Sequence, residues 1–158
     1  MIQKLLIVLL FALSTSLFWF GKKSDFEIVS SSKQAFHGGR PGSGGSTKYH
    51  FTFRMKKPSE KLTIDKLWVN EKELDLKQVV FMGAKAGNFS KNDTVRFTAE
   101  ERIASLTEKL SKDKAKTEQK VEPPIEYEGA ALIGYKVGSK RKYKIVDGFE
   151  LLKTLNAP

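Results

Sequence analysis

The chain has 158 residues, contains no cysteine, and carries 28 Lys and Arg against 18 Asp and Glu, a formal net charge of +10. This length favours one domain over two, and the lack of cysteine excludes disulfides, thiolate catalysis, zinc–thiolate sites and lipid attachment through a cysteine. The Lys and Arg residues are scattered, which is typical of a solvated surface and leaves attraction to an anionic surface as the alternative. Only Lys140–Lys144 is a dense basic run, so the pattern disfavours nucleic acid as a partner.

The first 20 residues form an apolar leader. Leu5–Phe20 contains no charged residue, and Lys22 and Lys23 follow after one glycine. This layout is typical of a secretory signal or a short membrane anchor. The run of roughly sixteen residues is slightly shorter than a spanning helix and slightly longer than a signal core. We expect residues 1–20 to be a signal peptide or membrane anchor, and residues 21–24 to be a linker.

Two fates of this leader stay open. Ser14 and Ser16 are the small residues that a signal peptidase needs before Leu17, which favours cleavage. The aromatic cluster Phe18–Phe20 beside two lysines instead suits an uncleaved anchor at the membrane–water interface. A buried N-terminal core helix is a third interpretation. Either of the first two makes the protein exported, and periplasmic or attached to the cell envelope.

Alternating apolar and polar residues predict β-strands through most of residues 25–158. The clearest pattern is Thr47–Lys56, where Tyr49, Phe51, Phe53 and Met55 alternate with polar residues, as in a half-buried strand. Further extended segments are predicted at Asp25–Phe36, Leu62–Val69, Leu74–Val80, Thr94–Thr98, Gly129–Val137 and Arg141–Asp147. Phe149–Leu155 is predicted as a final strand or a short helix.

The hydrophobic register predicts two hairpin turns. An even-length turn at Asn70–Glu73 keeps the apolar residues of both flanking segments on one face. After Val137, a three-residue turn at Gly138–Lys140 keeps Tyr135 and Tyr143 on one face. A two-residue turn would place Tyr135 beside a lysine and split the apolar set, so we expect the three-residue turn.

One segment changes to a helical pattern. Thr98 and Glu101 match a capping box, and apolar residues follow at helical spacing. We expect a short helix over Ala99–Leu110 and then a Lys/Glu-rich linker to Pro124. A disordered crossing without a helix is the alternative, and in both cases residues 99–124 form an insertion.

About seven short strands with turn signals between them predict a mainly β protein. The expected fold is one antiparallel β-sandwich domain, immunoglobulin-like or similar, over residues 25–158. It carries one short helical or disordered insertion and is preceded by the signal or anchor segment.

The glycine-rich segment His37–Ser46 is the one place that invites a functional assignment. It fits the phosphate-loop pattern GxxxxGK[ST] only in part, because Gly45 stands where the lysine belongs and a strand follows where a helix is needed. A glycine-rich turn can still present backbone N–H groups to an anion. A simple connection between strands, or a protein contact, is the alternative.

The candidate binding residues belong to this segment and to the strand after it. They are His37, Gly38, Gly39, Arg40, Gly44, Gly45, Lys48, Tyr49 and Arg54. His37 and His50 are the only histidines, and no Asp or Glu lies near them at ligand spacing, so we expect no metal site. No catalytic motif is evident, so we expect no catalytic residue and no cofactor.

These patterns predict a non-enzymatic, exported protein of the cell envelope that acts as a binding or structural module. The alternative is a weak carbohydrate or anionic-polymer binder, or a degenerate hydrolase, for which a histidine and a carboxylate should share one pocket. The expected partner is an envelope protein or an anionic polysaccharide or lipid surface. Membrane contact would be made through residues 5–20.

Overall fold

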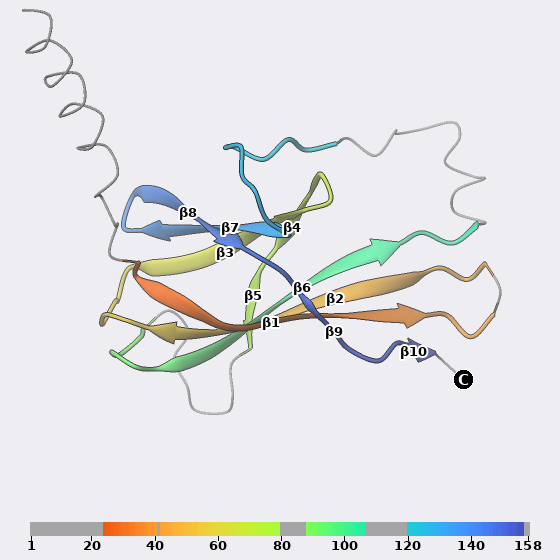
Figure 1. The fold of residues 1–158 in the computed structure, drawn as a ribbon, viewed down its shortest axis with the longest axis horizontal. Helices are drawn as coiled ribbons and strands as arrows, with labels where there is room; N and C mark the ends of the chain where they lie inside the picture. The colour runs from red at the N-terminus through yellow and green to blue at the C-terminus, as the bar shows by residue number, and fades with distance from the viewer. Residues whose placement is uncertain (1–23, 41, 80–87, 107–119, 157–158) are drawn as a thin grey trace, which may run out of the picture.

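The computed structural model describes residues 24–40, 42–79, 88–106 and 120–156, and these contain two β-sheets and almost no helix (Figure 1). The strands are β1 Phe26–His37, β2 Gly45–Met55, β3 Leu62–Val69, β4 Lys72–Asp75, β5 Lys77–Val79, β6 Thr94–Ile103, β7 Ala131–Val137, β8 Lys140–Val146, β9 Glu150–Leu151 and β10 Leu155–Asn156. The prediction of a mainly β protein is confirmed. Among the described residues no helix has the length and apolar content to cross a membrane. The predicted leader, residues 1–20, lies outside them.

The larger sheet has the strand order β10-β1-β2-β6-β5, and β9 also pairs with β1. Its long strands β1, β2 and β6 are antiparallel, whereas the short strands β9 and β10 run parallel to β1. This sheet is therefore mixed and not wholly antiparallel as expected. The smaller sheet has the order β4-β3-β7-β8 and is antiparallel throughout. Figure 1 shows the smaller sheet lying over the larger one.

One hydrophobic cluster joins the two sheets. The apolar residues predicted from the alternating pattern of β2 are all buried in it: Tyr49, Phe51, Phe53 and Met55. The ring of Phe26 on β1 lies 4.8 Å from that of Phe53 and meets the ring of Tyr135 on β7 edge-on at 5.0 Å. The contact between Phe26 and Tyr135 thus joins the two layers, and such an aromatic pair contributes about 0.5–1.5 kcal/mol beyond area burial.

The first predicted hairpin turn is confirmed. Val69 pairs with Lys72, so the turn is the even-length pair Asn70–Glu71, and Leu67 pairs with Leu74. Both turn residues have positive φ, 50° and 60°. The chain then leaves the smaller sheet, because the predicted strand Leu74–Val80 is divided between β4 and β5, which belong to different sheets.

The three-residue turn predicted at Gly138–Lys140 is wrong. Val137 pairs with Lys140, so the turn has two residues, Gly138 has φ 61°, and Tyr135 lies opposite Lys142. The prediction assumed that the smaller sheet has one apolar face.

The smaller sheet is in fact apolar on both faces. Trp68 and Leu132 are buried outside the joint cluster, and Tyr143 meets the ring of Trp68 edge-on at 5.9 Å. Residues 120–130 cross this outer face, where the Tyr127 hydroxyl donates a hydrogen bond to the Trp68 carbonyl at 3.3 Å. The outer apolar residues therefore have a cover of their own.

The helix predicted from Ala99 is wrong over Ala99–Ile103, which lie in β6. Thr98 and Glu101, the expected capping box, lie in β6 and pair with His50 and Thr47 of β2. Pairing along nearly the whole of β2 supplies more backbone hydrogen bonds than one helix cap, so tertiary context overrides the local signal. Residues 107–110 of the predicted helix, and half of the insertion, lie outside the described residues.

Candidate functional site

The β1–β2 hairpin ends in a hydrogen-bonded turn. It is here called the hairpin tip and comprises residues 37–40 and 42–45. His37 pairs with Gly45 at its base, and the Gly38 N–H donates to the Gly44 carbonyl at 3.0 Å. The Ser43 N–H and Oγ both donate to the Arg40 carbonyl, at 3.1 and 2.7 Å. Figure 1 shows the tip at the end of the molecule opposite to Ser24, where the described chain begins.

Residues 103–106 pack against the tip and account for two of its glycines. The Leu106 N–H donates to the Gly42 carbonyl at 2.9 Å. Gly42 and Gly44 have φ 80° and 79°, a region that favours glycine. A Cβ on Gly44 would lie 2.5 Å from the Ile103 carbonyl oxygen, so a side chain there would displace backbone. Turn geometry and close packing therefore account for Gly42 and Gly44. Two backbone N–H groups of the tip, those of Gly38 and Ser43, already donate hydrogen bonds within it.

The predicted binding residues do not all meet at the tip. His37, Gly39 and Arg40 are exposed there, with Gly38, Gly44 and Gly45 forming the turn. The Lys48 Nζ lies 4.8 Å from the centroid of the Phe36 ring, a cation–π distance. Arg54 stands near the other end of β2, about 30 Å from Gly45 at 3.3 Å per residue, and forms an ion pair with Glu27 at 3.1 Å.

Tyr49 belongs to the core and is unsuited to surface contact. It is 1% exposed, and its hydroxyl donates to Glu101 Oε2 at 2.9 Å. Burial, together with the Glu101 carboxylate, raises the pKa of Tyr49, so the phenol stays protonated. Its role is to tie β2 to β6 beneath the surface.

A shallow depression around His50 was not predicted from the sequence. It has a volume of about 540 Å³ and is lined by Lys48, His50, Glu73, Leu74, Asp75, Lys77, Thr98, Ala99 and Glu100. A histidine and carboxylates thus share one depression, which is the arrangement expected of a hydrolase.

Two carboxylates of this depression, Glu73 and Asp75, belong to ion pairs. Lys66 holds Glu73 at 2.6 Å and Asp75 at 2.9 Å, and its hydrogen bond lowers the pKa of Asp75. Within the described part of the chain, the imidazole of His50 forms no hydrogen bond. No group of three or more His, Asp or Glu residues among those described could hold a metal ion.

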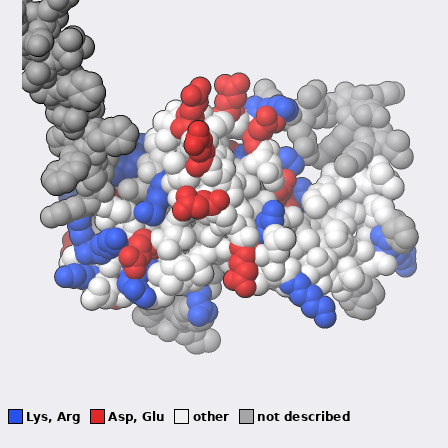
Figure 2. Space-filling view, in the orientation of Figure 1, with Lys and Arg blue, Asp and Glu red and all other residues white. Residues whose placement is uncertain are grey.

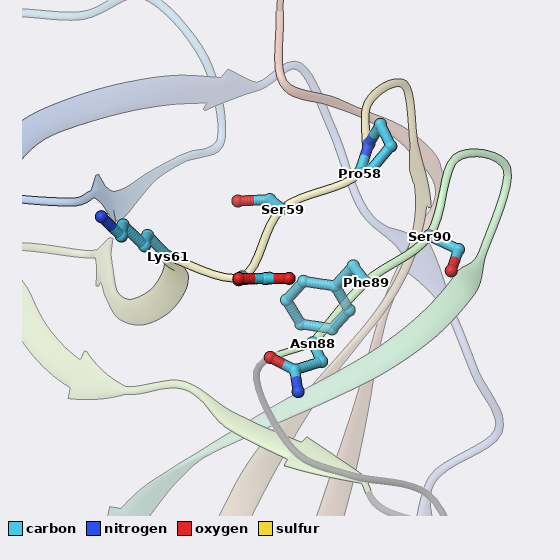
Figure 3. Close-up of a pocket in the computed structure, with 7 residues that line it drawn as sticks. Pro58, Ser59, Lys61, Asn88, Phe89 and Ser90 are labelled. Atoms are coloured by element: carbon cyan, nitrogen blue, oxygen red, sulfur yellow. The ribbon is translucent and has the colours of Figure 1, made fainter.

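A second depression lies between the β2–β3 connection and residues 88–90 (Figure 3). Its volume is about 600 Å³, and its lining is Pro58, Ser59, Glu60, Lys61, Asn88, Phe89 and Ser90. Ser59 and Phe89 exchange two backbone hydrogen bonds of 2.8 and 3.1 Å across its floor. This contact joins two connections, and the described residues place no nucleophile–base pair there.

At the end of the molecule where the described chain begins, three side chains donate hydrogen bonds to Asp25. Its carboxylate accepts hydrogen bonds from Lys142 at 2.8 Å and Lys57 at 3.3 Å, and from the Tyr135 hydroxyl at 3.4 Å. Burial acts to raise the pKa of Asp25, but the two lysines outweigh it and the pKa is lowered. Burial, together with Asp25, raises the pKa of Tyr135 to about 12. Lys144, beside Ser24, has a pKa lowered by burial and by Lys56.

Comparison with known proteins gave no match, whether with family models, curated proteins or solved structures.

Proposed function

We propose that the protein is a non-enzymatic interaction module of the cell envelope, exported by its leader, that contacts a partner through the hairpin tip. The two sheets act as a β-sandwich scaffold of immunoglobulin-like type. The joint core stiffens the long strands β1 and β2, which carry the tip away from Ser24. Binding and catalytic residues are often found on loops that a rigid scaffold positions.

The observation that supports this proposal is the form of the tip itself. Its turn is fixed by internal hydrogen bonds and by the packing of residues 103–106, while Arg40 and His37 are exposed. A preformed surface loses less conformational entropy on binding than a flexible one.

The charge of the tip favours an acidic partner surface. Residues 37–45 include Arg40 and no Asp or Glu. The same feature supports a second candidate function, binding of an anionic polysaccharide. The two candidates differ in what is captured, a protein or a polymer, and both require Arg40.

The test is capture from the envelope fraction of the source cells with three tagged chains: wild type, Arg40→Glu and Lys77→Glu. Lys77 is an exposed residue of β5, and its reversal makes the same change in net charge away from the tip. We expect a component that Lys77→Glu retains and Arg40→Glu loses, and that dissociates at high salt. Equal capture by all three chains would remove the tip from the proposal.

Fractionation and intact mass test the compartment. A mature chain starting near residue 17 in the exported fraction, or the full chain in the membrane fraction, agrees with the proposal. The full chain in the cytoplasm contradicts it and brings nucleic acid back as a partner to test.

A further inference from the structure

We propose that the end of the molecule at Ser24, here called the basic end, docks on anionic phospholipid headgroups. The proposal rests on the export function proposed above, with the leader retained as a membrane anchor. The basic end comprises Ser24, the β2–β3 connection, residues 88–93 and the β7–β8 hairpin. Its basic residues are Arg54, Lys56, Lys57, Lys61, Lys91, Lys136, Lys140, Arg141, Lys142 and Lys144.

Hydrogen bonds bring these separate segments together. The Lys56 N–H donates to the Asp25 carbonyl at 3.0 Å, which places the β2–β3 connection beside the start of the described chain. The Gly138 N–H donates to the Lys61 carbonyl at 2.9 Å, which joins the β7–β8 turn to the same connection. The Asn92 N–H donates to the Met55 carbonyl at 2.8 Å and adds residues 88–93.

The basic end carries an excess of positive charge. Against its ten basic residues stand six acidic ones, Asp25, Glu27, Glu60, Asp65 (the ion-pair partner of Arg141), Asp93 and Asp147, which leaves a net charge of +4. Figure 2 shows Lys and Arg side chains gathered where the described chain begins, whereas most Asp and Glu side chains lie toward the middle of this face.

Four lysines of the basic end are available to an outside partner. Lys61, Lys91, Lys136 and Lys140 are exposed, and within the described part of the chain they form no hydrogen bond or ion pair through their side chains. Lys140 directly follows the two-residue turn at Gly138–Ser139, and Lys136 lies two residues before it, so both belong to the end of one hairpin. Their charges are therefore not neutralised within this part of the protein.

The position of the apolar leader in the sequence selects lipid as the partner. Leu5–Phe20 is uncharged, and only Gly21, Lys22 and Lys23 separate it from Ser24. Four residues span at most about 14 Å, so in an anchored chain the basic end lies next to the headgroups. The hairpin tip is about 40 Å farther along the twelve-residue strand β1. Lysines close to an anionic leaflet attract it, and the attraction extends over about one Debye length, 8–10 Å.

The absence of cysteine allows a site-specific test on the full chain. The chain is reconstituted in vesicles of phosphatidylcholine, with or without phosphatidylglycerol, that contain a headgroup-linked acceptor dye. A donor dye is attached at Ser139→Cys in the β7–β8 turn, or at Thr154→Cys beside β10, both of which are exposed positions. We expect strong energy transfer from Ser139→Cys in anionic vesicles, lower transfer in neutral vesicles or high salt, and weaker transfer from Thr154→Cys than from Ser139→Cys in anionic vesicles.

Charge reversal gives the second arm of the test. Lys136→Glu/Lys140→Glu, in the Ser139→Cys chain, should lower the ratio of docked to undocked protein roughly fivefold for each lysine. The matched control Lys120→Glu/Lys153→Glu changes net charge equally at exposed residues outside the basic end and should leave the ratio unchanged. Unchanged secondary structure and unfolding midpoint establish that both variants fold.

Three results would overturn the proposal: equal transfer from the two dye positions, equal transfer in neutral and anionic vesicles, or an equal loss in the two charge variants. A full chain that associates with neither vesicle also overturns it. None of these results bears on the hairpin tip, which is tested by the Arg40-dependent capture.

Discussion

Gly134 is the position at which the smaller sheet has no room for a side chain. It lies in the middle of β7, buried, between Lys66 of β3 and Tyr143 of β8. A Cβ at this position would lie 2.6 Å from Trp68 Cζ3 and 3.0 Å from Arg141 Nη2. Because carbon atoms make favourable contact at about 3.5–4.0 Å, Gly134→Ala requires the indole to move by about 1 Å.

The indole has little freedom to make this movement. Trp68 is 5% exposed, Tyr143 packs against its ring, and residues 120–130 cross the face on which it lies. Insertion of a methyl group into a packed site costs about 1–3 kcal/mol. Replacement of glycine by alanine also reduces the entropy of the unfolded chain, which stabilises by about 0.4–1 kcal/mol.

Gly148→Ala is the matched control, because a Cβ at Gly148 meets no atom within 4 Å and its φ is not positive. The unfolded-state effect is similar in both variants and cancels in their difference. Urea unfolding should therefore place Gly134→Ala below Gly148→Ala by about 1–3 kcal/mol, or roughly 2–12 °C in Tm for a chain of this size.

A double-mutant cycle tests the cause of this difference. Trp68→Phe removes Cζ3 and Cη2, the indole atoms that the new methyl group meets. In that background Gly134→Ala should lose at least half of its destabilisation, a coupling energy of about 0.5–3 kcal/mol. Equal free energies of unfolding for the two alanine variants, or no coupling to Trp68, would refute the reasoning.

Two further predictions concern the β3–β4 turn and Asp25. Glu71→Gly should raise the free energy of unfolding by about 1 kcal/mol, because Glu71 has φ 60° and Asn-Gly is a preferred two-residue hairpin turn. The lost ion pair with Lys120 is largely exposed and offsets little, so an unchanged urea midpoint would contradict the turn geometry. For Asp25, a lowered pKa means stabilisation that is present above the usual value of 3.8 and is lost as the pH falls through the folded-state pKa. The difference in stability between wild type and Asp25→Asn should therefore shrink as the pH falls below 3.8 and through the folded-state pKa, and a constant difference would show that the carboxylate is not preferentially ionised in the folded state.

Strands whose hydrophobic pattern reports one buried face could be predicted from the sequence. β2 agrees with its prediction within a few residues, because its inner residues alternate with polar ones. β3 has the predicted bounds although Trp68 is buried on its outer face. The length of the turn at Gly138 could not be predicted in this way. The argument that apolar residues on both sides of a turn share one face does not hold when both faces of the sheet are apolar. Trp68 and Leu132 are buried on the second face. Residues 120–130 cover them, but these residues show no apolar periodicity from which that position could be predicted.

The false helix and the depression around His50 have a common physical origin. Both depend on pairing between distant segments, which local patterns do not contain. Glu101 fits a helix cap in sequence, but in the fold it pairs with Thr47 and accepts the Tyr49 hydroxyl. Glu73 and Asp75 reach the neighbourhood of His50 only because the chain changes sheets after β4. The separation of Arg54 from the hairpin tip, in contrast, follows from the length of β2 and could have been inferred.

The hairpin tip and the basic end lie at opposite ends of β1, and this geometry makes the two proposals independent. If the leader stays attached, the basic end faces the lipid and the tip is presented about 40 Å away, clear of the headgroups. Arg40→Glu should then abolish capture without changing energy transfer at Ser139→Cys, whereas Lys136→Glu/Lys140→Glu should do the reverse. If the leader is cleaved, the basic end no longer has a reason to lie near lipid, and only the capture should persist. A variant at one end that impairs both measurements would show that the ends do not act separately.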